Sequence, residues 1–199
     1  LDRLRASVNL DGRDADAWSN LGLVLMAIGH HAAAVEVFGK ALALAPNVSE
    51  IEANLASAQS AAGQVAEAEA TARRVLARET GHAKAWFILA LALQPQGRML
   101  EALEAATKAY GYAPEQEGYA GLKAQLENGI GAPEKARATL EKALARNPMS
   151  VPLRYELGNV LEYRIKDLPA AVAAYEQVLR IDPRHGPALS QCTFLTSRL

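Results

Sequence analysis

The sequence lacks several features that define common classes of protein. Its single cysteine, Cys192, excludes an internal disulfide framework. Aromatic residues make up only 6% of the chain, which disfavours a β-sandwich core, and no apolar run approaches the roughly 20 residues that cross a bilayer. Neither sign of charge dominates, because 21 Lys and Arg stand against 22 Asp and Glu. We therefore expect no membrane span and no nucleic-acid partner, since a phosphate backbone is usually bound by a basic face.

What the sequence does contain favours a folded helical protein. Half of its 199 residues are hydrophobic, with alanine and leucine dominant, and this composition is typical of closely packed helices. Leu1 is not an initiator methionine, and no signal-peptide pattern follows it. We expect a cytoplasmic protein whose N-terminus has been shortened, and a native chain that continues beyond both ends.

Several residue types recur at one fixed step of 34 residues. Glycine recurs at Gly29, Gly63, Gly97 and Gly131, and alanine at Ala34, Ala68, Ala102 and Ala136. Leucine and proline keep the same frame at Leu21, Leu55, Leu89, Pro46, Pro114 and Pro148. A period of this length indicates a stack of helical hairpins, one per repeat.

Each recurrent residue has a physical role in such a hairpin. The first helix of the first repeat presents an apolar stripe at helical spacing, Trp18, Leu21, Gly22 and Leu25. The second helix presents the matching stripe, Ala34, Phe38 and Ala41. The small residue in the first stripe lets the partner helix approach closely. We expect the recurrent glycine to end the first helix with a positive φ.

The pattern Trp18-x2-Leu21-Gly22-x2-Leu25, followed by Ala34-x3-Phe38 and Pro46, resembles the tetratricopeptide repeat. The resemblance covers roughly residues 15 to 185. It implies an all-α fold, an α-solenoid of tetratricopeptide-type helical hairpins that form a right-handed superhelix.

In this frame the chain is one solenoid domain, 1–199. It divides into a partial repeat helix, five repeats and a terminal helix, at residues 1–14, 15–48, 49–82, 83–116, 117–150, 151–185 and 186–199. The fifth repeat carries one extra residue between Leu161 and Leu168.

Repeats three and four depart from the pattern. The run Gln94-Pro95-Gln96-Gly97 predicts an early end or a kink in one first helix. Gly118 and Gly121 fall inside the next first helix and weaken it. We expect a softer segment between about residues 94 and 131; ordinary drift between repeats and a hinge are the two interpretations of it.

No constellation of catalytic or metal-binding residues emerges. His30 and His31 lie at an inter-helix turn and His82 and His185 at repeat boundaries, so none has the i, i+4 partner of a helical zinc site. We interpret all four as exposed turn residues and Cys192 as a packing residue. By itself the chain is expected to be no enzyme and to need no cofactor or metal.

The resemblance implies that certain positions of each first helix face a concave groove. In this chain the candidate peptide-binding residues are Asn20, Leu23, Met26, Asn54, Ser57, Phe87, Leu91, Gln94, Gln125, Asn128, Tyr155, Asn159 and Tyr163. Amide side chains both donate to and accept from an extended peptide backbone, so the favoured function is a protein–protein or peptide-binding scaffold. For Leu23 and Leu91, packing within the helix seams is an equal alternative.

Two further interpretations remain open. Asn20 and Asn54 share one repeat position, which resembles the asparagine ladder of O-linked N-acetylglucosamine transferases. The chain would then be the substrate-recruiting repeat region of a larger glycosyltransferase, although Ile88, Leu122 and Glu156 interrupt the ladder. The third interpretation is self-association through exposed terminal helices, because Leu189, Cys192, Leu195 and Leu199 lie along one side of the last helix, with Phe194 beside it.

Overall fold

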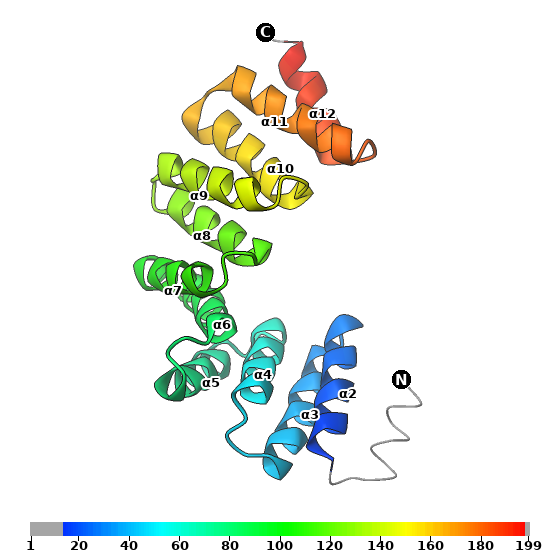
Figure 1. Cartoon of the computed structure of the whole chain (residues 1–199), viewed down its shortest axis with the longest axis vertical. Helices are drawn as coiled ribbons and strands as arrows, with labels where there is room; N and C mark the ends of the chain where they lie inside the picture. The colour runs from blue at the N-terminus through cyan, green and yellow to red at the C-terminus, as the bar shows by residue number, and fades with distance from the viewer. Residues whose placement is uncertain (1–13, 198–199) are drawn as a thin grey trace. The chain divides into compact units, whose positions relative to one another are not determined.

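The computed structural model describes residues 14–197, and all regular structure in this range is helical (Figure 1). The predicted helix over 1–14 therefore lies, apart from Asp14, outside the described residues, as does Leu199. The helices are α2 (Ala15–Ala27), α3 (His31–Leu44), α4 (Ser49–Ala61), α5 (Val65–Arg78), α6 (Ala83–Leu93), α7 (Met99–Tyr112), α8 (Glu117–Gly129), α9 (Pro133–Arg146), α10 (Val151–Val160), α11 (Leu168–Ile181) and α12 (Gly186–Thr196). The predicted all-α class is confirmed for this part of the chain.

The chain divides into two compact units. One ends at Ala105 and the other begins at Ala106, so the boundary falls within α7. This boundary lies inside the segment between residues 94 and 131 that the sequence predicts to be soft. Hinge motion in that segment stays a prediction. No helix within residues 14–197 has both the length and the apolar character required to cross a membrane.

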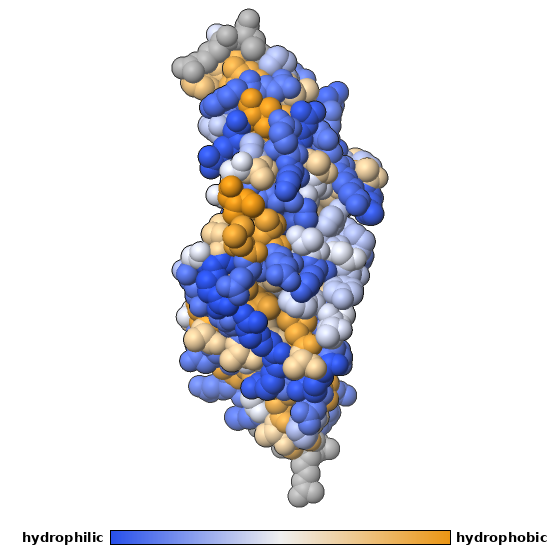
Figure 2. Space-filling model, turned by 90° about the vertical axis from the view of Figure 1, so that its left-hand side faces the viewer, coloured by the Kyte–Doolittle hydropathy of each residue, from blue (hydrophilic) through white to orange (hydrophobic). Residues whose placement is uncertain are grey.

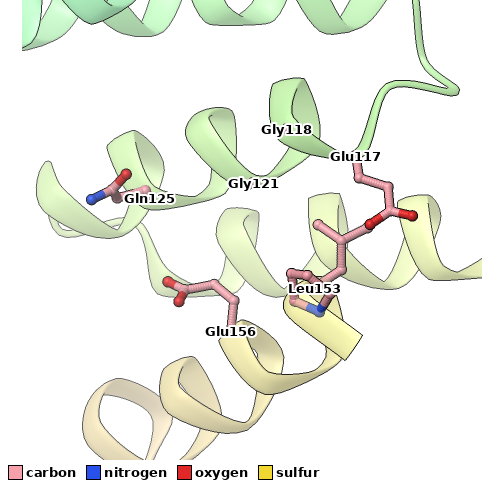
Figure 3. A pocket seen from close by; sticks show the side chains of 7 residues that line it. Glu117, Gly118, Gly121, Gln125, Leu153 and Glu156 are labelled. Atoms are coloured by element: carbon pink, nitrogen blue, oxygen red, sulfur yellow. The ribbon is translucent and has the colours of Figure 1, made fainter. Parts of the chain in front are cut away.

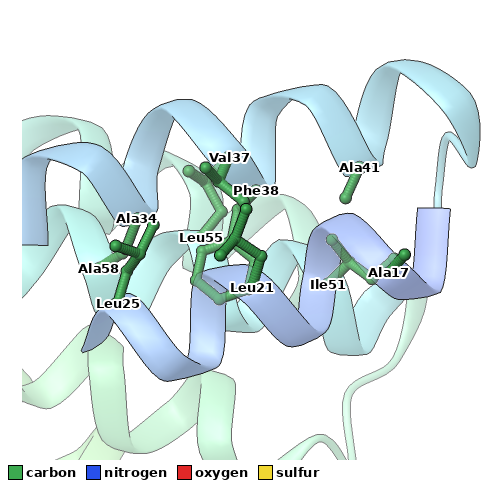
Figure 4. Packing of buried hydrophobic residues seen from close by; sticks show 10 residues of the cluster. All are labelled: Ala17, Leu21, Leu25, Ala34, Val37, Phe38, Ala41, Ile51, Leu55 and Ala58. Carbon is green, nitrogen blue, oxygen red and sulfur yellow. The ribbon is translucent and has the colours of Figure 1, made fainter. Parts of the chain in front are cut away.

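The hairpin of α2 and α3 shows how one repeat is held together (Figure 4). Leu21 and Leu25 from α2 pack against Ala34 and Phe38 from α3, in a cluster that α4 completes. A Cβ added at Gly22 would lie 2.6 Å from Cε1 of Phe38. Only glycine therefore lets the Phe38 ring, which is fully buried, lie against the α2 backbone.

The recurrent glycines end the first helices as predicted. Their φ values lie in the left-handed region, at 79° for Gly29, 79° for Gly63, 75° for Gly97 and 81° for Gly131. At the first of these turns the N–H of His30 donates to the carbonyl of Leu25 at 2.8 Å, which closes the end of α2. The first helix of the third repeat, α6, also ends early as predicted. It stops at Leu93, and a short 3₁₀ helix covers Gln94–Gln96.

The extra residue of the fifth repeat is absorbed by a change of helix type. The first helix continues from α10 into a single π-helical stretch, Leu161–Ile165. Lys166 then occupies the turn with a φ of 68°, where the other repeats have glycine. A lysine in the left-handed region is strained, since its Cβ crowds the neighbouring carbonyl.

Replacing Lys166 with glycine should stabilise the protein. We expect Lys166→Gly to raise the free energy of unfolding by about 1 kcal/mol, because glycine adopts this φ without the steric cost. Urea denaturation followed by circular dichroism measures the difference. The matched control is Lys135→Gly on α9, where glycine replaces a helical lysine and should destabilise. A loss of stability in Lys166→Gly would contradict the strain argument.

A partly buried carboxylate links the second hairpin to the turn that follows α6. Glu69 on α5 accepts hydrogen bonds from Nε2 of Gln96 at 2.7 Å, from Nε of Arg73 at 2.9 Å and from Nη1 of Arg98 at 2.8 Å. These donors, the Gln96 amide foremost, lower the pKa of Glu69 from 4.5 to about 2, against the opposing effect of burial.

The Glu69 cluster should make stability depend on acid pH. Below its unfolded pKa of 4.5, Glu69 binds a proton more readily in the unfolded chain than in the folded one, so its contribution is present above 4.5 and is lost as the pH falls toward about 2. We expect Glu69→Gln to be less stable than the wild type at pH 7 and the difference to shrink between pH 4.5 and pH 2. Urea titrations across this range test it; a constant difference would refute it.

Candidate binding site

In the first unit, the candidate groove residues differ widely in accessibility. On α2, Asn20 is exposed, Leu23 is 45% exposed and Met26 is partly buried. On α4, by contrast, Asn54 is only 5% exposed, and its amide oxygen accepts a hydrogen bond from Nζ of Lys84. The remaining candidates of this unit are partly buried on α4, α6 and the 3₁₀ turn: Ser57, Phe87, Leu91 and Gln94.

The candidates on α10 and its π-helical extension are held by residues of α11, α12 and the turn between them. Oδ1 of Asn159 lies 3.0 Å from the hydroxyl of Tyr175 on α11. The ring of Tyr155 packs against the rings of Tyr175 and His185, with centroids 5.6 Å and 5.0 Å apart. Tyr163 is exposed and its hydroxyl accepts from Nε2 of Gln191 at 2.6 Å. These side chains therefore stabilise the packing at the end of the second unit, in addition to any role in binding.

The remaining two candidates lie on α8. Gln125 is exposed, while Asn128 is partly buried and its amide oxygen is fully buried without a hydrogen-bond partner. Of the thirteen predicted residues, Gln125 is the one that lines a defined cavity between α8 and α10 (Figure 3).

This α8/α10 cavity has a volume of about 430 Å³. Its lining residues are Glu117, Gly118, Gly121, Gln125, Pro152, Leu153 and Glu156. The hollow exists because α8 presents two glycines on this side. A Cβ at Gly118 would meet no atom within 4 Å, and one at Gly121 would first meet Cδ2 of Leu153 at 3.9 Å. Larger residues at either position would begin to fill the space.

The cavity carries negative charge that the protein itself does not neutralise. Glu117 accepts hydrogen bonds from the amide of Asn147 and from the hydroxyl of Ser150, the latter at 2.6 Å. Glu156 lies 3.5 Å from the amide nitrogen of Asn159. All three donors are neutral, and within residues 14–197 neither carboxylate forms an ion pair. Beside them, Leu153 offers an apolar wall. This combination suits a positively charged group carried on an aliphatic stem.

Sequence reasoning found the components of this cavity but not their role. Glu156 is predicted only as an interruption of an asparagine ladder, and Gly118 and Gly121 only as helix-weakening residues. The available signal was their spacing, since residues three apart share one helix face. Glycine at both positions leaves that face of α8 without side chains.

The histidines at the repeat boundaries have a structural role that the sequence analysis missed. Nδ1 of His82 accepts from the N–H of Ala85 at 3.3 Å, and Nδ1 of His185 accepts from the N–H of Ala188 at 3.2 Å. Each therefore caps the start of a helix and is partly buried, so the prediction that both are exposed turn residues was wrong. Over residues 14–197, no group of three or more His, Cys, Asp or Glu side chains is placed to hold a metal ion.

Exposed apolar residues are spread over several helices and do not mark a second site. Figure 2 shows one face of the molecule, on which orange hydrophobic areas alternate with blue polar ones. On α12, Leu195 is 3% exposed and packs with Cys192 against α11, whereas Leu189 and Phe194 remain about half exposed. Self-association through this helix stays a prediction.

Comparison with known protein families decides the architecture. Three profiles described as tetratricopeptide repeat match the sequence, over residues 25–92, 83–116 and 123–185. The chain belongs to the tetratricopeptide repeat family. The α-solenoid of helical hairpins predicted from the 34-residue period is thereby established as its fold. No curated protein matches the sequence.

Solved structures of other tetratricopeptide repeat proteins share this fold. TTC0263 from Thermus thermophilus has a TM-score of 0.75 at 22% identity, over 92% of this chain and all of that one. Pseudomonas aeruginosa PilF has a TM-score of 0.80 at 22% identity, over 94% of this chain and 86% of that one. YrrB, described as having an unusual peptide-binding site, has a TM-score of 0.66 at 15% identity, over 98% of both chains. At these identities the likeness extends to the fold alone.

Filling the cavity with methyl groups should stabilise the repeat protein. We expect Gly118→Ala/Gly121→Ala to raise the free energy of unfolding by about 1 kcal/mol, chiefly through position 121, because alanine is favoured over glycine in a helix interior and both Cβ atoms have room. Urea denaturation measures the change. Gly39→Ala on α3, where an added Cβ also meets nothing, is a control for the helix effect alone. Destabilisation of the double variant would show that α8 needs its glycines for packing.

Proposed function

We propose that this tetratricopeptide repeat chain is a non-catalytic scaffold that binds a protein or peptide segment across its first helices. The observation that carries the proposal is the α8/α10 cavity, which lies between two consecutive first helices. It combines unneutralised carboxylates, an exposed amide and an apolar wall. Proteins of this fold are interaction modules, and one structural relative is described as peptide-binding.

The chemistry of the cavity defines the partner more closely. A lysine or arginine side chain of the bound segment would place its aliphatic stem along Leu153 and its charged end beside Glu156. Glu156 is the better counter-ion, because Glu117 is already engaged by Asn147 and Ser150. Gln125 is exposed next to this point and has an amide that pairs with a peptide backbone. The segment we propose is therefore extended and basic at one position.

The glycosyltransferase alternative gains no comparable support. In the first unit, Asn20 is exposed, whereas Asn54 is buried and bonded to Lys84. The two asparagines that suggested a ladder therefore present different surfaces. The chain's place in a larger protein remains a prediction.

A displayed library of random peptides tests the proposed function. We expect selected peptides to share a Lys or Arg, and replacement of that residue by norleucine to weaken binding about tenfold or more, because a charge-assisted hydrogen bond is lost. Gly121→Leu, which places a side chain in the cavity, should abolish binding without loss of helicity. Glu156→Gln should weaken the basic peptide and leave the norleucine peptide unaffected. Isothermal titration calorimetry provides the affinities.

Matched controls separate the cavity from general charge effects. Glu176→Gln removes one exposed carboxylate from α11, away from the cavity, and should leave the affinity unchanged. If selected peptides carry no basic residue, or bind Gly121→Leu as well as the wild type, the cavity is not the binding site and the proposal fails.

A further inference from the structure

A second cavity in the second unit is separate from the proposed peptide site and has the opposite charge. Its volume is about 440 Å³, within the range of about 300–1,000 Å³ that is typical of small-ligand pockets. It shares no lining residue with the α8/α10 cavity. The residues that line it come from α7, the following loop, α8 and α9: Thr107, Tyr110, Gly111, Pro114, Lys123, Ala138, Thr139, Lys142 and Arg146.

Polar residues stand in this cavity at positions where the other repeats are apolar. Lys123 occupies the repeat position of Leu21, Leu55, Leu89 and Leu157. Tyr110 occupies the position of Leu42, Leu76, Leu144 and Leu179. Because leucine is sufficient for the hairpin everywhere else, the fold itself does not require an ammonium or a hydroxyl at these two points.

Three cationic side chains line the cavity, and only one of them is neutralised. Nζ of Lys123 lies 2.5 Å from Oε1 of Glu127 and 2.6 Å from Oγ1 of Thr139, whose hydroxyl donates to Glu127 at 2.8 Å. Lys142 and Arg146 are exposed on α9 and form no ion pair with any residue in the range 14–197. No carboxylate lines the cavity, so it has an excess of positive charge.

The hydroxyl of Tyr110 provides an independent indication of a ligand. Tyr110 is 7% exposed, its ring packs in the cluster of α8 and α9, and its hydroxyl is buried without a hydrogen-bond partner. Buried polar groups of folded proteins are almost always paired. A phenylalanine would fill the same space without this loss, so the hydroxyl is explained by a group that the described residues do not supply.

We propose that this cavity binds the oxyanion, phosphate or carboxylate, of a small organic ligand. Lys142 and Arg146 supply the charge that attracts and holds the anion, and Arg146 offers a planar pair of donors that matches either oxyanion. Tyr110 supplies its hydroxyl from the buried side, where the anion gives it an acceptor. Pro114, Ala138 and the Tyr110 ring contact the rest of the ligand. This site is independent of the proposed peptide site.

Titration of the full chain with three probes at constant ionic strength tests the inference. The probes are inorganic phosphate, glycerol 2-phosphate and succinate, with chloride as the compensating salt, and binding is followed by amide and Arg146 Nε–H chemical shifts. We expect saturable binding. A higher affinity for glycerol 2-phosphate identifies a phosphate monoester as the ligand class, and a higher affinity for succinate identifies a carboxylate.

Two variants test the contributions of the cationic side chains and of the Tyr110 hydroxyl to binding. Lys142→Ala/Arg146→Ala should weaken binding about tenfold or more, since two charge-assisted contacts are lost. Tyr110→Phe should weaken binding about threefold to tenfold through the loss of one hydrogen bond, with no decrease in Tm, because the hydroxyl has no partner in the free protein.

The control removes the same charge elsewhere. Lys135→Ala/Arg180→Ala takes two cations from exposed positions of α9 and α11 that do not line the cavity, and it should bind like the wild type. The inference is overturned if none of the probes binds saturably, if the control loses as much affinity as Lys142→Ala/Arg146→Ala, or if Tyr110→Phe binds unchanged.

Discussion

Two helices can form one of these hairpins only if their facing side chains are complementary in size. Where the second helix presents a ring, the first helix must present glycine, as Gly22 does for Phe38 and Gly158 does for Tyr175. Where the second helix presents leucine, as at Leu140, the first can present alanine, as at Ala124, and both are fully buried. Every other property of the array depends on this contact, because it sets how closely each pair of helices can approach and hence how the next pair stacks.

The same constraint distinguishes glycines that serve the fold from glycines that do not. Gly22 and Gly158 face aromatic rings, and the recurrent turn glycines adopt a left-handed backbone. Gly118 and Gly121 do neither: both are helical, and neither is crowded. A residue that weakens a helix without serving its packing stands out in a repeat protein, since the other repeats show what the position needs. The same comparison singles out Tyr110 and Lys123.

The sequence predicted the fold well because its signals were periodic. Leu21, Gly29 and Ala34 recur at one step, so each repeat confirms the others, and helix ends such as Leu93 followed from a single proline. The candidate site was harder to predict from the sequence, because the position of a residue in the repeat does not determine what its side chain contacts. Asn54 and Asn159 occupy the repeat positions from which the site was predicted, yet one is buried against Lys84 and the other lies against Tyr175. The α8/α10 cavity exists where Gly118 and Gly121 have no side chain. A sequence pattern identifies side chains that are present and does not reveal the space that missing ones leave.

The hydrogen-bonded trio of Lys123, Glu127 and Thr139, in which Lys123 is partly buried, bears on how a chain of similar repeats assembles in the right order. Hairpins with the same apolar stripes are interchangeable in principle, and misassembly between neighbours is a characteristic failure of repeat proteins. If α8 paired with α3 or α11 in place of α9, Lys123 and Glu127 would face Val37 or Ala174 where Thr139 now stands. A buried ion pair that loses a hydrogen-bond partner is strongly disfavoured. The trio thus disfavours pairing of α8 with α3 or α11, whereas α5 carries a threonine, Thr71, at the repeat position of Thr139 and is not distinguished in this way.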